Sequence, residues 1–263
     1  MSPAGGRARG ALRQISAALQ LVGIDVARAY TCLVETPYFV RTAIRYARLA
    51  RKSPFPFQIS SVRPMLYDRH QQAGAIQSHY FFQDMWAAKK IHAIKPDRHV
   101  DVGSLIEGFV AHVLCFMPVE IIDIRPLRAQ VPGLTVLQAD ATHLSNIPDN
   151  SVESLSSLHA IEHFGLGRYG DPIDPDACSH AMAALARVLR PGGRLYFSVP
   201  IGRQRVEFNS QRIFGPDKVL DAFSDLKLVS FSVVDDECRF CEDVNPAAFG
   251  GARYSCGLFE FTK

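Results

Sequence analysis

Polar residues that could bind a ligand follow four hydrophobic segments in the middle of the chain. The first three segments deliver Asp101, Asp123 and Asp140, and the fourth runs into His159 and His163. The carboxyl ends of parallel strands meet at one edge of an open α/β sheet, so these side chains would converge there. This order and spacing predict a binding edge for a nucleoside-bearing ligand.

Asp123 follows Asp101 by 22 positions. This is close to the spacing of about 20 residues at which an acid meets the ribose hydroxyls in dinucleotide-binding folds. A carboxylate can accept hydrogen bonds from both hydroxyls of the diol. The alternative is an ion pair with Arg125 or Arg128.

The first turn carries Gly103, Ser104 and Gly108, and glycine lets the backbone approach a ligand closely. Glu107 stands in the same turn, where its charge would repel a phosphate, so the sequence favours a ligand without phosphate there. Leu105 occupies a position where such turns often have a further glycine. The alternative for a single Asp-x-Gly is an ordinary tight turn.

His159 and His163 lie one helical turn apart, next to Glu162, at the end of the fourth segment. Histidine is the usual side chain for removing a proton near neutral pH, so either could be a general base. A purely structural role for both is the remaining alternative.

Two loops carry further candidates for substrate binding. Residues 165–176 combine glycines and prolines with polar side chains, as in a lid, and two arginines in 202–209 favour an acceptor that bears a carboxylate or phosphate. The alternatives are an ordinary surface connection and ion pairs around the rim. The candidates are Arg168, Tyr169, Asp171, Arg203, Arg205, Glu207 and Asn209.

The elements that would position these residues alternate between strand and helix. Residues 1–75 predict helices interrupted at Pro37 and at 53–57. Two late strands without a helical pattern between them favour antiparallel pairing. The expected helices are 78–94 (with Ser78 as N-cap), 108–116, 174–190 and 216–225, and the expected strands are 99–101, 119–124, 134–138, 153–158, 194–200, 226–234 and 254–263.

Charge separates the beginning of the chain from the rest. The net charge of +3 over 263 residues divides into +8 for residues 1–70 (11 basic, 3 acidic) and −5 for the remainder (18 basic, 23 acidic). We expect a basic helical extension over 1–75, with residues 38–52 in peripheral contact with an anionic membrane; a solvated face is the alternative. Residues 1–30 are compatible with a targeting segment or with a packed helix.

Six cysteines are too few and too scattered for a disulfide framework, which favours a cytoplasmic protein, and the basic first segment is compatible with a place at the inner membrane surface. Cys238 and Cys241 form a lone CxxC that could join Cys256 at a metal, but no second pair completes the set, and we expect no metal. No apolar run approaches the roughly 20 residues of a membrane helix.

Residues 78–263 resemble the class I S-adenosylmethionine-dependent methyltransferases. The motifs HYFFQD, HVDVGS, DIRP, HAIEHFGLGRYGDPIDPD and RPGGRLYFSVPIGRQRVEFN are most similar to an uncharacterised bacterial-type family linked to surface polysaccharide pathways. The resemblance implies an α/β fold over residues 76–263: a doubly wound, mostly parallel, seven-stranded sheet with an antiparallel C-terminal hairpin.

The resemblance also implies roles for individual residues. Asp101 would lie near the amino group of S-adenosylmethionine. Asp140, with the backbone of Ala141, would bind adenine, while Ser157 and Leu158 would contact the cofactor through their backbone.

The implied reaction is O-methylation of a small or glycan-like acceptor, including an anionic sugar. The alternatives are a non-catalytic cofactor-binding module and a nicotinamide-dependent oxidoreductase. We do not expect nucleic-acid binding, because the chain has no basic surface interleaved with aromatic residues.

Overall fold

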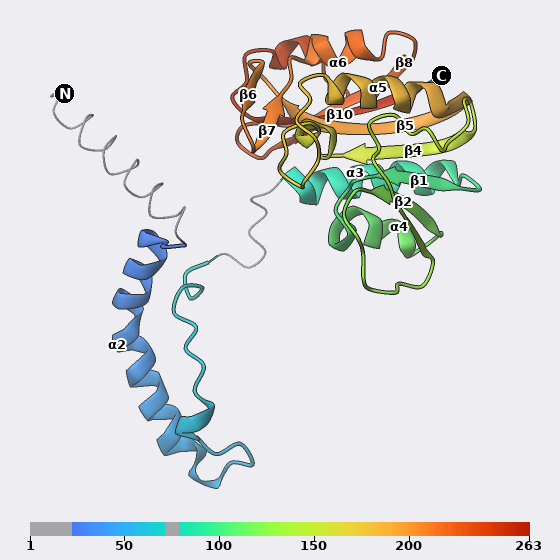
Figure 1. Ribbon diagram of the computed structural model, residues 1–263. Coiled ribbons are helices and arrows are strands. Elements are labelled where there is room, and N and C mark those ends of the chain that lie inside the picture. Colours follow the sequence, from blue (N-terminus) through green and yellow to red (C-terminus); the bar gives the residue numbers. More distant parts are fainter. Residues whose placement is uncertain (1–22, 72–78) are drawn as a thin grey trace, which may run out of the picture. The chain divides into compact units, whose positions relative to one another are not determined.

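The computed structural model describes residues 23–71 and 79–263, and the chain divides into two compact units, Met1–Ala75 and Ile76–Lys263. The predicted Ser78 cap and most of the ambiguous 1–30 segment lie outside the described residues. Figure 1 shows both units, coloured along the chain.

The first unit is built on one long helix, α2 (Val26–Leu49), which begins after the N-cap Asp25. The predicted interruption at Pro37 is wrong, because the helix continues through it. Proline cannot donate to the carbonyl four residues earlier, but that residue, Leu33, is 74% exposed, so water can solvate the group. Two short 3-10 helices follow, Ala50–Lys52 and Ile59–Ser61.

The carboxylate of Glu35 ties α2 to the end of this unit. It accepts a hydrogen bond from Arg69 at 2.8 Å and contacts Nε2 of His70 at 2.9 Å. Arg41, Arg45 and Arg48 are all exposed on α2. No helix in the described part of the chain is long and apolar enough to cross a membrane.

The second unit contains an eight-stranded sheet in the order β3-β2-β1-β4-β5-β10-β8-β9. The first five strands run parallel, and β10 pairs antiparallel with both β5 and β8. The strands are β1 (His99–Val102), β2 (Val119–Asp123), β3 (Leu134–Gln138), β4 (Val152–Leu158), β5 (Leu189–Ile201), β8 (Lys227–Val234), β9 (Phe240–Cys241) and β10 (Ser255–Thr262).

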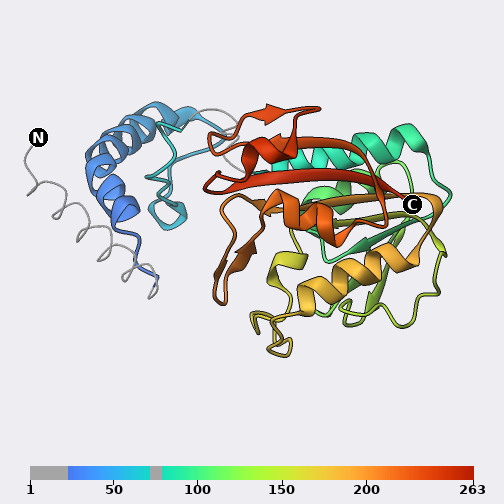
Figure 2. The ribbon, with the colours of Figure 1, turned by 90° about the horizontal axis from the view of Figure 1, so that it is seen from above.

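Helices cover both faces of this sheet (Figures 1 and 2). One hydrophobic core packs α5 (Ala177–Val188) and α6 (Pro216–Ala222) against one face. A second core packs α3 (His79–Ile94), η3 (Ile106–Val110) and α4 (Ala111–Leu114) against the other face.

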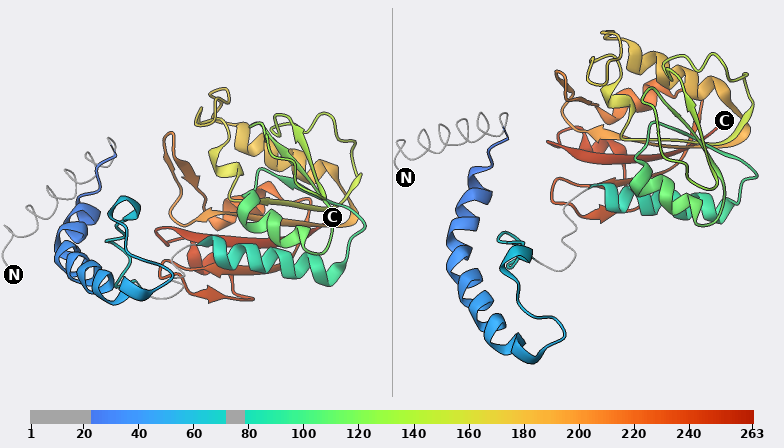
Figure 3. Two further views of the ribbon diagram at one scale, coloured as in Figure 1. Left: turned by 90° about the horizontal axis from the view of Figure 1, so that it is seen from below. Right: turned by 60° about the horizontal axis from the view of Figure 1, so that its bottom comes forward.

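The fold class and the antiparallel end of the sheet are as predicted, but β5 begins at Leu189, five residues before its predicted start, and two further details differ. The short β9, paired antiparallel with β8, raises the strand count from the predicted seven to eight. The hairpin of β6 (Arg205–Glu207) and β7 (Gln211–Ile213) was not predicted either. Strands of two or three residues are too short for a recognisable alternation of side chains. Figure 3 shows this hairpin projecting from the main sheet.

A row of buried polar side chains crosses β1 and β4 on the α3 side of the sheet. His99 contacts the hydroxyls of Ser154 at 2.8 Å and Ser156 at 3.0 Å, and Ser156 donates a hydrogen bond to Asp101. Burial lowers the pKa of His99 to about 3. These hydrogen bonds give partners to polar groups that would otherwise be buried without any.

Candidate functional site

A cavity of about 530 Å³ opens at the carboxyl ends of β1, β2, β3 and β4. This volume lies within the range of about 300–1,000 Å³ that is usual for small-molecule sites. Nine of the residues predicted for the site line it: Gly103, Asp123, Asp140, Ala141, His159, His163, Arg168, Tyr169 and Asp171.

The turn after β1 forms one wall of this cavity. Gly103 has φ +71°, and a Cβ there would lie 3.0 Å from Cβ of Ala160, so glycine is required for both its dihedral angle and its close packing. Leu105, the position expected to carry a glycine, is half exposed and lines the cavity.

Asp101 is fully buried and holds this turn from below instead of lining the cavity. It accepts hydrogen bonds from the backbone N–H of Ser104 at 2.9 Å and from the Ser104 hydroxyl at 2.6 Å. Burial raises the pKa of Asp101 to about 6, against the opposing effect of these bonds.

Four other predicted cofactor residues likewise lie behind the lining. The Ser104 hydroxyl accepts from the backbone N–H of Leu158 at 3.0 Å, and Ser157 donates to the carbonyl of Val102 at 3.0 Å. Gly108 packs against α3, since a Cβ there would lie 2.2 Å from a carboxylate oxygen of Asp84. These residues fix the path of the turn.

Asp123 lines the cavity, but Arg125 occupies its carboxylate. The backbone N–H, Nε and a terminal nitrogen of Arg125 donate to it at 2.8, 3.0 and 2.6 Å. The Arg125 guanidinium also lies 4.6 Å from the ring centroid of Tyr169. The ion pair considered as the alternative to ribose binding is therefore the arrangement observed.

Asp140 accepts a hydrogen bond from the backbone N–H of Thr142 at 2.8 Å, which makes it an Asx turn. Only Oδ1 takes part in this bond, and Ala141 beside it is 5% exposed. Asp140 can thus hold the loop and still present an acceptor to a ligand.

His159 follows β4 with φ +49°, held by hydrogen bonds from its N–H to the carbonyl and hydroxyl of Ser198 at 3.0 and 3.1 Å. Its Nδ1 lies 2.7 Å from Oε1 of Glu162, and its Nε2 lies 3.2 Å from Sγ of Cys256. Burial disfavours the charged imidazole, but Cys256 and Glu162 together hold the pKa of His159 well above its usual range.

His163 has different surroundings. Its Nδ1 donates to the carbonyl of Ser210 at 2.7 Å, which assigns the proton of the neutral ring to Nδ1. Nε2 lies 3.8 Å from Oε1 of Glu162. Burial lowers the pKa of His163, in contrast to the raised pKa of His159.

The loop over the cavity is ordered by its own hydrogen bonds. Asp171 accepts from the backbone N–H groups of Gly167 at 3.2 Å and Tyr169 at 3.1 Å. Arg168 donates to the carbonyl of Ser210 at 3.1 Å and lies 5.1 Å from the ring centroid of Tyr169. The polar side chains of the loop are thus set at the mouth of the cavity.

The second predicted acceptor segment does not line the cavity. Arg205 pairs with Glu207 at 2.9 Å and donates to the carbonyl of Arg253, while Arg203 and Asn209 are exposed. The next two residues, Ser210 and Gln211, line it instead. These predicted residues lie in or next to the hairpin of β6 and β7, whose strands are too short to be recognised in the sequence.

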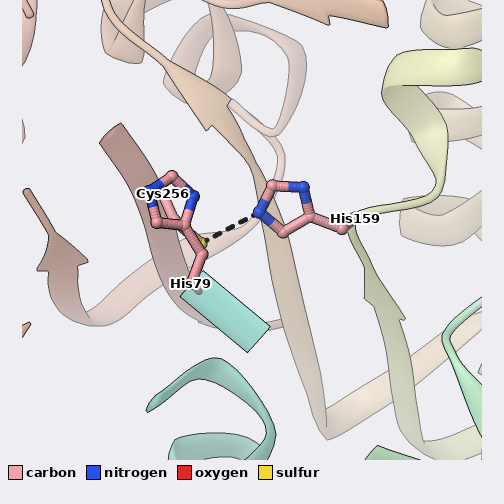
Figure 4. Close-up of side chains that lie close together, drawn as sticks. All are labelled: His79, His159 and Cys256. Carbon is pink, nitrogen blue, oxygen red and sulfur yellow. Dashed lines mark hydrogen bonds between the residues drawn. The ribbon is translucent and has the colours of Figure 1, made fainter. Parts of the chain in front are cut away.

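Sequence reasoning also missed a cluster formed by His79, His159 and Cys256. Figure 4 shows their side chains pointing toward one another from the start of α3, the end of β4 and β10. One possible ligand atom from each lies within 4.8 Å of the others. Among the described residues, Cys238 and Cys241 do not join Cys256 in a group of this kind. No sequence spacing connects residues this far apart.

Comparisons with known proteins place this chain by its fold. A family described as Caenorhabditis protein of unknown function, DUF268, matches residues 130–239, less than half of the chain. No curated protein sequence matches significantly.

Solved structures give a broader likeness. The [4+2]-cyclase SpnF is similar with a TM-score of 0.50 and 15% identity, over 68% of this chain and 81% of that one. The N-methyltransferase NodS from Bradyrhizobium japonicum, in complex with S-adenosyl-L-homocysteine, has a TM-score of 0.49, 12% identity and coverage of 72% and 89%. The 1,6-didemethyltoxoflavin-N1-methyltransferase of Burkholderia thailandensis has a TM-score of 0.48 and 17% identity, over 70% of this chain and 79% of that one. The second unit has the Rossmann-like methyltransferase fold, and identities this low show the fold alone.

Proposed function

We propose that this protein transfers a methyl group from S-adenosylmethionine to an oxygen of a small or glycan-like acceptor. The observation that carries the proposal is the joint lining of one cavity by the Gly103 turn, Asp123, Asp140 and His163. Groups that could bind the methionine portion, the ribose and the adenine of the cofactor, and a group that could remove the proton of the methyl acceptor, thus follow one another along a single sheet edge.

The chemistry of the lining fits this cofactor. The Gly103 turn lets the backbone approach the methionine portion, Asp123 would accept from the ribose hydroxyls, and Asp140 would accept from the adenine amino group. Glu107 is exposed in the first helical turn, where a dinucleotide fold would bind phosphate. The antiparallel β10 also differs from the parallel strand order of dinucleotide-binding folds. When bound, the cofactor supplies an electrophilic methyl group on a positively charged sulfur.

His163 is the general base that the geometry favours. It lines the cavity, and burial together with the Nδ1 bond to Ser210 leaves a neutral ring with a lone pair on Nε2. His159 is less suited, because both of its ring nitrogens already have partners, Nδ1 in Glu162 and Nε2 in Sγ of Cys256. Alignment of the acceptor with the methyl group supplies the larger part of the acceleration.

The loop residues at the cavity mouth suit a polar or anionic acceptor. Arg168 brings a guanidinium, which binds carboxylate or phosphate, and Asp171 and Tyr169 accept or donate to hydroxyl groups. A sugar nucleotide or an acidic glycan combines these features. The exposed arginines of α2 would suit a lipid-linked acceptor of this class.

Calorimetry of the full chain with S-adenosylmethionine and S-adenosylhomocysteine tests the cofactor, and a methyl-transfer screen over sugar nucleotides then tests the reaction. We expect both cofactors to bind, Asp140→Ala to weaken binding at least tenfold, and His163→Ala to slow single-turnover transfer about 10²-fold with cofactor affinity kept. Failure of the wild-type chain to bind either cofactor would overturn the proposal.

A non-catalytic binding module is the second candidate. The contacts of His163 with the carbonyl of Ser210 and of His159 with Glu162 and Cys256 favour it, because both candidate bases already have hydrogen-bonding partners within the protein. The similarity to SpnF, a [4+2]-cyclase by name, illustrates that this fold hosts other chemistry. Tight cofactor binding without turnover on any acceptor in the screen supports this candidate.

A further inference from the structure

We propose that His79, His159 and Cys256 form a zinc site at the acceptor end of the cavity. This inference rests on the arrangement of side chains in the second unit and does not depend on the proposed methyl transfer. His159 is itself part of the cavity lining, so a metal held there would lie next to a bound acceptor.

The distances between the three side chains suit a tetrahedral ion. Zn–S and Zn–N bonds of about 2.3 and 2.0–2.1 Å at a tetrahedral angle place sulfur and nitrogen about 3.6 Å apart. Nε2 of His159 lies 3.2 Å from Sγ of Cys256, and the ligand atom of His79 lies within 4.8 Å of both. Small rotations of the side chains would therefore bring all three atoms to one ion.

The three ligands come from elements with fixed positions. Cys256 lies in β10 between Pro200 of β5 and Val234 of β8. His159 is held by its backbone bonds to Ser198, and the ring of His79 stacks on Tyr254 with centroids 5.2 Å apart. A site built on strands and a helix end can impose its geometry on an ion.

Glu162 supplies the outer partner that zinc-binding histidines usually have. Its Oε1 lies 2.7 Å from Nδ1 of His159 and is fully buried, which fixes the proton on Nδ1 and turns the lone pair of Nε2 toward the cluster. A carboxylate, a histidine and a metal in this order form a recurrent zinc arrangement.

The ligand types point to zinc and to an incomplete shell. Thiolate and imidazole together suit zinc among the common divalent ions, while magnesium and calcium prefer oxygen. Three protein ligands with a fourth position for water or substrate are typical of catalytic zinc. Gln83 lies one helical turn after His79, and its Oε1 is 3.8 Å from Sγ of Cys256. This oxygen accepts a hydrogen bond from Ser198 at 2.6 Å, so it lies beside the cluster without being one of the three ligands.

The wild-type full chain tests the site directly. After loading with one equivalent of zinc and removal of excess, X-ray absorption at the zinc edge should give one sulfur at about 2.3 Å and two or more nitrogen or oxygen neighbours at about 2.0–2.1 Å. Cobalt titration should give a thiolate-to-metal charge-transfer band that saturates at one equivalent. Two or more sulfur neighbours would assign the ion to the CxxC, and no sulfur would assign it elsewhere; either result overturns the proposal.

Variants locate the ligands. We expect Cys256→Ser and His79→Ala each to weaken zinc binding at least 100-fold and Cys256→Ser to abolish the charge-transfer band. The matched control is Cys238→Ser with Cys241→Ser, which removes two thiols outside the cluster and should leave affinity within twofold. If Cys256→Ser does not fold, as judged by circular dichroism, the zinc affinity of His79→Ala and the X-ray absorption spectrum of the wild type test the site. A chain that binds no zinc in the micromolar range leaves His159 and Cys256 as a metal-free hydrogen-bonded pair and refutes the site.

Discussion

Arg125 holds both carboxylate oxygens of Asp123, with Nε 3.0 Å from Oδ1 and a terminal nitrogen 2.6 Å from Oδ2. The same guanidinium lies over the ring of Tyr169 in the loop at the mouth of the cavity. A ribose that bound Asp123 would have to replace the arginine, and the arginine would then leave the carboxylate while keeping its aromatic neighbour.

This competition predicts opposite effects of two neighbouring substitutions. Asp123→Ala should weaken S-adenosylhomocysteine binding at least tenfold, because the ribose loses a charged acceptor. Arg125→Ala should strengthen binding several-fold, because no ion pair has to be broken. Isothermal titration of both variants measures the effect. Weaker binding in both would show that Arg125 contacts the ligand and does not compete with it.

Two glycines of the loop over the cavity separate dihedral strain from steric clash. Gly165 and Gly170 have φ of +73° and +83°, but a Cβ at Gly165 would lie 1.9 Å from the carbonyl oxygen of Asp174, while nothing lies within 4 Å at Gly170. Gly170→Ala should cost about 1 kcal/mol in the free energy of unfolding. Gly165→Ala should cost several times more and weaken S-adenosylhomocysteine binding, since Gly165 lines the cavity. Equal losses in urea denaturation would contradict this account.

The sheet could be predicted from the sequence because each of its main strands is a hydrophobic run that ends in a distinctive residue. The strands at 134–138 and 152–158 lie within one residue of their predicted limits, whereas β5 begins five residues before its predicted start. The helix through Pro37 could not be predicted, because helix propensity does not include the solvation of the carbonyl group that proline leaves without a donor. The strands β6, β7 and β9 are too short to produce a pattern.

The part of the candidate site that lies at the carboxyl ends of the parallel strands could be predicted from the sequence. Asp123 and Asp140 line the cavity because parallel strands deliver their ends together. Asp101 and Gly108 flank the first turn but lie behind the cavity lining, and the sequence pattern does not encode the path of the backbone that places them there. His79 and Cys256 meet His159 through the order of β10 and the start of α3, which no local spacing encodes.

The buried His99 predicts a pH dependence of stability. Its pKa is about 3 in the folded protein and about 6.5 when unfolded, so between these values the unfolded chain binds a proton that the folded chain does not. The contribution of His99 to the free energy of unfolding should be greatest above pH 6.5 and should fall on acidification, by at most about 1.4 kcal/mol per pH unit.

The difference between wild type and His99→Gln isolates this contribution. Asp101, with a pKa raised to about 6, acts in the opposite direction, since its contribution to stability falls as pH rises from 3.8 to 6, but it is present in both proteins. Urea denaturation from pH 4 to 7.5 should therefore show a smaller loss on acidification for the variant. Parallel curves would mean that His99 is protonated in the folded state.

The exposed arginines of α2 predict binding to anionic lipid. Each basic side chain near such a surface contributes about 1 kcal/mol, so replacing three with glutamine should reduce co-sedimentation with phosphatidylserine vesicles at least tenfold at low salt. Neutral vesicles should not bind either protein. A control with the same loss of charge in the second unit should bind like wild type; equal losses in both would indicate a general charge effect. The variant changes Arg41, Arg45 and Arg48, and the control changes Arg203, Arg239 and Arg253.

Glu162 should tune the zinc site without binding the ion. Glu162→Gln keeps an oxygen that can accept from Nδ1 of His159 but removes the charge that makes Nε2 a stronger ligand. Zinc affinity should fall about 10- to 100-fold in competition with a chromogenic chelator, while the cobalt charge-transfer band keeps its position because Cys256 stays a ligand. Glu207→Gln, which alters an ion pair outside the cavity lining, is the control. If Glu162→Gln keeps the zinc affinity of the wild type while His79→Ala loses it, Glu162 does not contribute to the zinc site.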